Sequence, residues 1–184
     1  SANDATIALG EAVSGSESDF VELMNTTIKK WGCTNTNFVN TNGWQHKNHY
    51  TTARDMAIIT KHCFENEKLR EIALTKEYTM PATNMSSELK MENALLKVAS
   101  KVEGLTFGKT GSWSDSQCTI TLGFKESGLS AIIVLLGDTA KGRAVDPPKL
   151  VNVAHDLTPG FIVTDSDKNV CNTWVRHGTK SKVS

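Results

Sequence analysis

The first strand signal of a sheet lies in Val102-Glu103-Gly104-Leu105-Thr106-Phe107-Gly108-Lys109-Thr110-Gly111-Ser112. Apolar and small residues alternate along it, as they do in a strand with one buried face. Two apolar runs follow at 118–124 and 129–136, and the short loop Lys125-Glu126-Ser127-Gly128 between them is of the kind that closes a β-hairpin. We therefore predict three consecutive antiparallel strands in one sheet with helices packed on it, an α+β fold in which the first strand pairs with 129–136.

The tripeptide Lys109-Thr110-Gly111 would give the first strand a chemical use. Lys109 supplies a positive charge and Thr110 a hydroxyl donor, and Gly111 lacks a side chain, so that a substrate backbone could lie against the strand edge. Alone, the tripeptide is a weak signal, because ordinary composition produces it by chance. Its partner is Ser1-Ala2-Asn3, a Ser-x-Asn element of the kind that accompanies Lys-Thr-Gly in penicillin-binding proteins and serine β-lactamases.

Order, spacing and intervening phrases extend this match from Ser1 to about residue 155. The phrases include His49-Tyr50-Thr51-Thr52-Ala53-Arg54-Asp55 and Val102-Glu103-Gly104. The sequence resembles the low-molecular-mass penicillin-binding proteins, the serine D-alanyl-D-alanine carboxypeptidases of the bacterial envelope. The resemblance implies a β-lactamase/transpeptidase-like fold, an extracytoplasmic location, and acyl transfer on peptidoglycan stem peptides and β-lactams without a metal or another cofactor.

The resemblance also implies roles for individual residues. Ser1 and Lys109 would relay protons and Asn3 would orient the substrate amide, whereas Thr110 and Gly111 would bind the substrate. A Gly-Arg pair follows Lys-Thr-Gly at about this distance in the family, so Arg143 becomes a candidate for the terminal carboxylate of the substrate. The alternative for Arg143 is a solvated surface residue.

The nucleophile of the family is the serine of a Ser-x-x-Lys motif that precedes Ser-x-Asn. Since the sequence begins at Ser1, we expect a cut or truncated form that is incomplete at the N-terminus. Its partner would be the missing N-terminal segment or a second copy of the chain, and a missing buried helix should leave an apolar surface exposed beside the Lys109 strand. Ser87-Glu88-Leu89-Lys90 has the motif spacing, but it lies in a polar stretch without an apolar helix, and we interpret it as unrelated.

Two other functions are weighed against the carboxypeptidase. A class A β-lactamase would need a Glu-x-x-x-Asn element between the two motifs, and the sequence has none. A non-catalytic module that binds cell-wall peptides, either truncated or a pseudoenzyme, remains an alternative. The sequence upstream of Ser1 would distinguish this module from the carboxypeptidase.

Composition excludes other classes of protein. Lys and Arg number 20 and Asp and Glu number 20 among the 184 residues, without a basic run, so we expect no nucleic-acid partner. No apolar stretch is long enough to span a bilayer. We assign residues 1–157 to a partial penicillin-binding domain and 158–184 to a β-rich segment that starts a further module.

Cysteine and histidine spacing gives little sign of a metal. Cys33, Cys63, Cys118 and Cys171 lack C-x-x-C spacing, and we interpret them first as free thiols, with a disulfide left open. His46 and His49 lack further ligands at suitable spacing, so we expect His49 to anchor its loop.

Helix signals surround these motifs. We predict helices at 4–13, from the cap Ser16 to Trp31, from the cap Thr52 through residue 64, as a charged continuation at 65–74, and from Pro147-Pro148 through residue 155. We predict a short strand at 76–80 and a surface loop at 82–92. Thr106-Phe107-Gly108 looks like an insertion relative to the family, so we expect a register shift there.

Overall fold

The computed structural model describes residues 1–114 and 117–157. Along this part of the chain, groups of consecutive helices are separated by groups of consecutive strands. In order they are α1 (Asn3–Ser14), α2 (Glu17–Lys30), α3 (Ala53–Glu65), α4 (Glu67–Leu74), β1 (Glu77–Met80), β2 (Leu89–Glu92), α5 (Ala94–Val98), β3 (Leu105–Ser112), β4 (Cys118–Glu126), β5 (Leu129–Asp138) and α6 (Gly142–Leu157).

The central sheet is the antiparallel meander β3-β4-β5, and the predicted α+β fold is confirmed. One detail of the prediction is wrong: β3 pairs with β4, and β5 pairs with the other edge of β4. Each short hairpin connection places a strand next to its predecessor, so 129–136 cannot reach β3. The expected register shift is present as an irregularity between Leu105 and Phe107.

The main core lies on one face of this sheet. Ile120, Leu122 and Phe124 alternate along β4 and are almost completely buried. They pack against Leu95 of α5 and Val151 of α6. Burying side chains of this size contributes about 1.5–3 kcal/mol each, so this face holds the sheet together.

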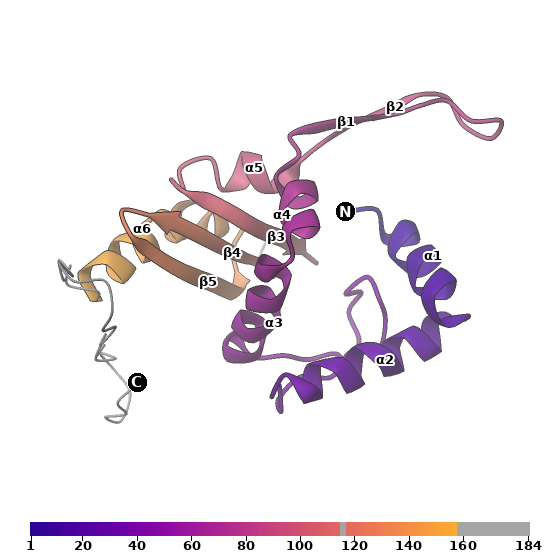
Figure 1. The fold of residues 1–184 in the computed structure, drawn as a ribbon, viewed down its shortest axis with the longest axis horizontal. Coiled ribbons are helices and arrows are strands. Elements are labelled where there is room, and N and C mark those ends of the chain that lie inside the picture. The colour runs from indigo at the N-terminus through magenta and orange to yellow at the C-terminus, as the bar shows by residue number, and fades with distance from the viewer. Residues whose placement is uncertain (115–116, 158–184) are drawn as a thin grey trace.

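Helix α3 covers the opposite face. The hydroxyl groups of Thr60 and Thr121 are hydrogen-bonded there, and the ring of Phe64 packs over Gly123, where an added Cβ would lie 3.0 Å from the ring. Figure 1 shows the sheet between these helices, whereas α1 and α2 lie apart from it and the β1–β2 hairpin projects away from the rest of the chain.

The predicted helix caps are confirmed. The side chain of Ser16 accepts the backbone N–H of Asp19, and that of Thr52 accepts the backbone N–H of Asp55. The predicted continuation after α3 is wrong in one respect: Asn66 ends α3 and caps α4 as a separate helix, because its side chain accepts the N–H of Leu69.

Two further predictions are corrected. The surface loop at 82–92 contains β2, which pairs with β1 from Glu77↔Glu92 to Met80↔Leu89. Both strands are mostly exposed, so they lack the alternation that marks a half-buried strand.

Helix α6 begins at Gly142 and includes the two prolines that were expected to start it. Its first turn forms around Thr139, whose hydroxyl accepts the N–H of Gly142 and whose carbonyl accepts that of Arg143. Arg143 is thereby fixed in the first turn.

Cys33 and Cys63 are free thiols, as expected, and Cys33 is buried. Cys118 is also buried, and its Sγ donates to the carbonyl oxygen of Ser114 at 3.3 Å. Cys171 and the predicted β-rich segment 158–184 lie outside the described residues.

Candidate active site

The structure brings Ser1 and Lys109 together although 108 positions separate them in the sequence. Lys109 lies on β3 opposite Thr121 of β4, and its Nζ donates a hydrogen bond to Ser1 Oγ at 2.7 Å. The Ser-x-Asn and Lys-Thr-Gly elements therefore meet at their first residues.

The surroundings of Lys109 change its acidity. Partial burial disfavours the charged ammonium group, and the positive charge of Arg143 adds repulsion, so the pKa of Lys109 lies below its ordinary value. The ammonium group also donates to the carbonyl oxygen of Thr110. Lys109 is consequently a better proton donor than an ordinary lysine, and its position next to a serine hydroxyl suits a proton relay.

Thr110 and Gly111 continue β3 beside this pair, and both are half-buried. A Cβ on Gly111 would lie 2.5 Å from Thr119 Oγ1. The neighbouring strand thus gives a structural reason for glycine at this position, in addition to the predicted room for a substrate.

Arg143 reaches from the first turn of α6 to the end of β3. Its Nη1 donates to the carbonyl oxygen of Gly111 at 2.6 Å and to Ser112 Oγ at 2.5 Å. Its Nε is buried and has no acceptor among the described residues. Arg143 is therefore half-buried and bound to the strand rather than solvated, and its guanidinium group keeps donor capacity for a carboxylate.

Asn3 is the predicted site residue that the structure does not bring into this group. It is the exposed first residue of α1, where its backbone carbonyl accepts the hydroxyl of Thr6 at 2.8 Å. Within the described ranges, its side chain makes no hydrogen bond to Ser1 or Lys109.

A hollow of about 1080 Å³ opens beside these residues. Ser1, Lys109 and Thr110 line it together with apolar side chains from α3, α4, the hairpin and β3, among them Met56, Ile59, Leu69, Ile72, Tyr78, Met91 and Phe107. Ile72 and Tyr78 are each 58% exposed. The predicted apolar surface beside the Lys109 strand is therefore confirmed.

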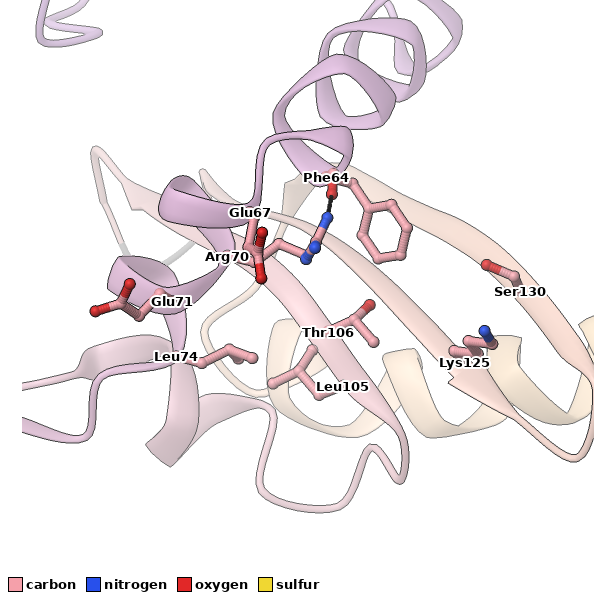
Figure 2. A pocket seen from close by; sticks show the side chains of 9 residues that line it. All are labelled: Phe64, Glu67, Arg70, Glu71, Leu74, Leu105, Thr106, Lys125 and Ser130. Carbon is pink, nitrogen blue, oxygen red and sulfur yellow. Dashed lines mark hydrogen bonds between the residues drawn. The ribbon is translucent and has the colours of Figure 1, made fainter.

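A second hollow, of about 610 Å³, lies where α3 and α4 meet the other end of the sheet, and Figure 2 shows the side chains that line it. Arg70 donates to the backbone carbonyl of Phe64 and lies 5.7 Å from the centre of its ring. Thr106 Oγ1 is buried here without a partner among the described residues. None of the predicted site residues lines this hollow.

Ser87 and Lys90 line neither of these hollows. Every residue from 81 to 90 is exposed, and the segment belongs to the hairpin that projects from the chain in Figure 1. No helix buries Ser87, which agrees with its interpretation as unrelated to the nucleophile.

His49 anchors its loop, as predicted. Its Nδ1 accepts the N–H of Val39 at 3.4 Å, and the next residue, Tyr50, forms an isolated β-bridge with Asn37. Over residues 1–114 and 117–157, no three His, Cys, Asp or Glu side chains are grouped as metal ligands would be. No helix in the same ranges has the length and hydrophobicity needed to cross a bilayer.

One pair of residues beside the site escaped the sequence reasoning. Trp44 and Trp113 pack edge to face at the end of β3, with their ring centres 4.8 Å apart. Neither belongs to a motif, and no local pattern links residues so distant in sequence.

The fold and the paired motifs define a protein of the penicillin-binding serine peptidase class. Residues 1–140 match the family model described as D-alanyl-D-alanine carboxypeptidase, and the chain belongs to this family. It is 35% identical over 180 residues to the carboxypeptidase DacF of Bacillus subtilis, covering 97% of this chain and 46% of the relative. It is 32% identical to DacA of Haemophilus influenzae, covering 100% of this chain and 46% of the relative. The chain thus spans about half the length of the curated relatives it matches.

Solved structures agree with this assignment. Penicillin-binding protein 5 of Haemophilus influenzae superposes with a TM-score of 0.74 at 32% identity, over 98% of this chain and 52% of that one. The Streptomyces K15 DD-transpeptidase gives a TM-score of 0.66 at 27% identity, over 76% of this chain and 55% of that one.

Proposed function

We propose that this chain supplies the Ser-x-Asn and Lys-Thr-Gly side of the active site of a serine-type D-Ala-D-Ala carboxypeptidase. The whole enzyme would trim peptidoglycan stem peptides in the bacterial cell envelope, outside the cytoplasm, and would be acylated by penicillins. The observation that supports this most directly is the 2.7 Å hydrogen bond from Lys109 Nζ to Ser1 Oγ.

The residues of this chain would act around a nucleophile supplied by another segment. The serine of Ser-x-x-Lys would attack the carbonyl carbon of the penultimate D-Ala, D-alanine would leave with a proton, and water would then release the acyl group. Ser1 and Lys109 would pass that proton. A lysine with a lowered pKa is deprotonated more often near neutral pH, so it can both accept a proton and release it again. Thr110 and Arg143 would hold the terminal carboxylate, and the exposed side chain of Asn3 would orient the substrate amide.

The large hollow suggests where the nucleophile would lie. Its apolar walls on α3 and α4 lie directly beside Lys109, and exposed side chains such as Ile72 would be buried by an apolar helix. A helix that carries Ser-x-x-Lys, from elsewhere in the same protein or from a second copy by exchange, would place its serine next to Ser1. On this proposal residues 1–157 form part of a catalytic domain, and 158–184 lead into a further module.

The alternative is a non-catalytic module that binds cell-wall peptides. It is favoured by one observation: the single Ser-x-x-Lys of this sequence lies on an exposed hairpin and not in the site. Such a module would use the same residues of β3 and the same carboxylate contact to Arg143 without any covalent step.

Acylation distinguishes the two functions. The chain by itself, incubated with a fluorescent penicillin and weighed intact, should form no covalent adduct. A fusion that joins the upstream segment of Bacillus subtilis DacF to Ser1 should form one adduct per molecule, on a serine of the added segment. An adduct on Ser87 of the unfused chain would refute our interpretation of that motif.

The role of Lys109 is tested in the fusion. Lys109→Ala should lower the acylation rate at least about a hundredfold, as expected for a positioned proton-transfer group. Lys101→Ala, at an exposed position away from the hollow, should leave the rate unchanged. A folded fusion that is not acylated at all would favour the binding module.

A further inference from the structure

Trp44 and Trp113 form an aromatic pair that stays largely open to solvent. Their rings meet at 89° with centres 4.8 Å apart, a favourable edge-to-face arrangement. Even so, Trp44 is 57% exposed and Trp113 is 48% exposed. The pair is therefore not part of a core, and its remaining aromatic surface faces outward.

The position of Trp113 relative to the site follows from the strand. The backbone N–H of Trp113 donates to the carbonyl of Gln117 at 3.2 Å, which extends the β3–β4 ladder one residue beyond the pair Ser112↔Cys118. Because side chains alternate along a strand, Trp113 lies on the same face of β3 as Lys109. Along β3 the order is therefore Lys109, which contacts Ser1, then Gly111 and Ser112, which contact Arg143, and then Trp113.

Trp44 comes from the segment between α2 and α3. Its backbone is held in a tight turn, where its N–H donates to Asn42 Oδ1 and its carbonyl accepts Asn40 Nδ2. Thr41, three residues before Trp44, is bound through its N–H and its hydroxyl to the carboxylate of Glu17 at the start of α2. The pair thus connects the segment anchored on α2 to the end of β3.

The spacing along β3 sets how far a peptide bound at Arg143 could extend before it reaches Trp113. The guanidinium group contacts Gly111 and Ser112, and Trp113 is the next residue of the chain. From Lys109 to Gly111 the strand rises about 7 Å, which accommodates one residue and its carboxylate. A further residue would add about 3.5 Å and would reach the indole rings.

We propose that Trp44 and Trp113 form a wall at the end of β3, which restricts binding along this strand to peptides with a free carboxylate one residue beyond the scissile carbonyl. The inference rests on the proposed function, and it names the residues that would limit the enzyme to removal of a single C-terminal residue. An enzyme lacking this wall would also accept peptides that extend past the second D-alanine.

The test measures peptide binding to the 184-residue chain by NMR titration of the isotope-labelled protein. The two ligands are N-acetyl-D-Ala-D-Ala and the same peptide with an added C-terminal glycine. Affinities are expected in the millimolar range, about 4 kcal/mol, since only one side of the site is present. The wild type should prefer the shorter peptide by at least about tenfold, because the extended one meets the wall.

The double variant Trp44→Ala, Trp113→Ala should bind the shorter peptide as before and should lose about tenfold of the preference. Any preference that comes from the contact of the carboxylate with Arg143 would remain, because Arg143 is unchanged. Trp44→Leu alone keeps an apolar side chain in the turn and should lose part of the preference, which provides a milder change if the double variant unfolds. Trp31→Ala serves as the control, since Trp31 stacks on His62 and lines neither of the two hollows.

The outcomes separate the two proposals. A preference that is the same in the wild type and in the folded variants would overturn the wall and leave the proposed function standing. Binding of the shorter peptide without signal changes at Arg143 or Lys109 would overturn both, and so would the absence of binding.

Discussion

Replacing Asp55 by alanine should separate the loop that precedes the Trp44 turn from helix α3. Asp55 is fully buried in the first turn of α3. Its Oδ2 accepts the backbone N–H of Asn35 and the hydroxyl of Thr36, both at 2.8 Å, and Thr36 is itself buried. This carboxylate is thus the common acceptor for two donors of the loop.

The expected loss follows from these two hydrogen bonds. A hydrogen bond to a charged group contributes about 1.5–3 kcal/mol, and a buried donor left without an acceptor costs about 1–3 kcal/mol. Asp55→Ala should therefore lower the free energy of unfolding by about 3–4 kcal/mol. Asp55→Asn should cost about 1–2 kcal/mol, because one amide oxygen in the place of Oδ2 can accept both donors, and Oδ1 has no partner among the described residues.

Urea unfolding, followed by circular dichroism and by tryptophan fluorescence, measures both losses. Asp156→Ala changes an exposed carboxylate on α6 and should stay within about 0.5 kcal/mol of the wild type. A cost below about 1 kcal/mol for Asp55→Ala, or an equal cost for Asp55→Asn and Asp55→Ala, would show that Asp55 is not the common acceptor that holds the loop.

Three further outcomes are expected. Gly108→Ala should cost about 1–3 kcal/mol in urea unfolding, because the new Cβ would lie 2.8 Å from the carbonyl oxygen of Thr121; an unchanged midpoint would contradict this close approach. Arg143→Gln should raise the pKa of Lys109, followed by NMR titration of its side chain, because a repelling positive charge is removed; a lower or unchanged pKa would be inconsistent with this repulsion. Burial, and then the charge of His46, lower the pKa of His49 in the folded chain. The unfolded chain therefore binds a proton at His49 more tightly than the folded chain does. Stability should therefore fall as the pH drops below about 6.5, and His49→Asn should reduce that pH dependence.

Elements with local signals were predictable from the amino-acid sequence. The helix caps Ser16 and Thr52 were readable because a cap is a contact between residues three positions apart. The strands of the sheet were readable because one of their faces is buried, which forces alternation of side chains. The exposed strand β2 has no buried face, and it was missed for that reason.

Part of the site was also predictable, because spaced motifs carried it. The resemblance to a family predicted that Ser1 and Lys109 would converge, and the structure places them in hydrogen-bonding contact. The resemblance predicted the same for Asn3, but the structure gives Asn3 no hydrogen bond to Ser1 or Lys109 among the described residues.

Contacts between distant segments became visible only in the folded chain. Arg143 binds the end of β3 because α6 begins five residues earlier than its prolines suggest, around a turn formed by Thr139. Trp44 and Trp113 meet because a loop anchored on α2 folds toward the end of the strand. Such contacts depend on packing between elements and not on the local preferences of either segment, so no pattern within one segment predicts them.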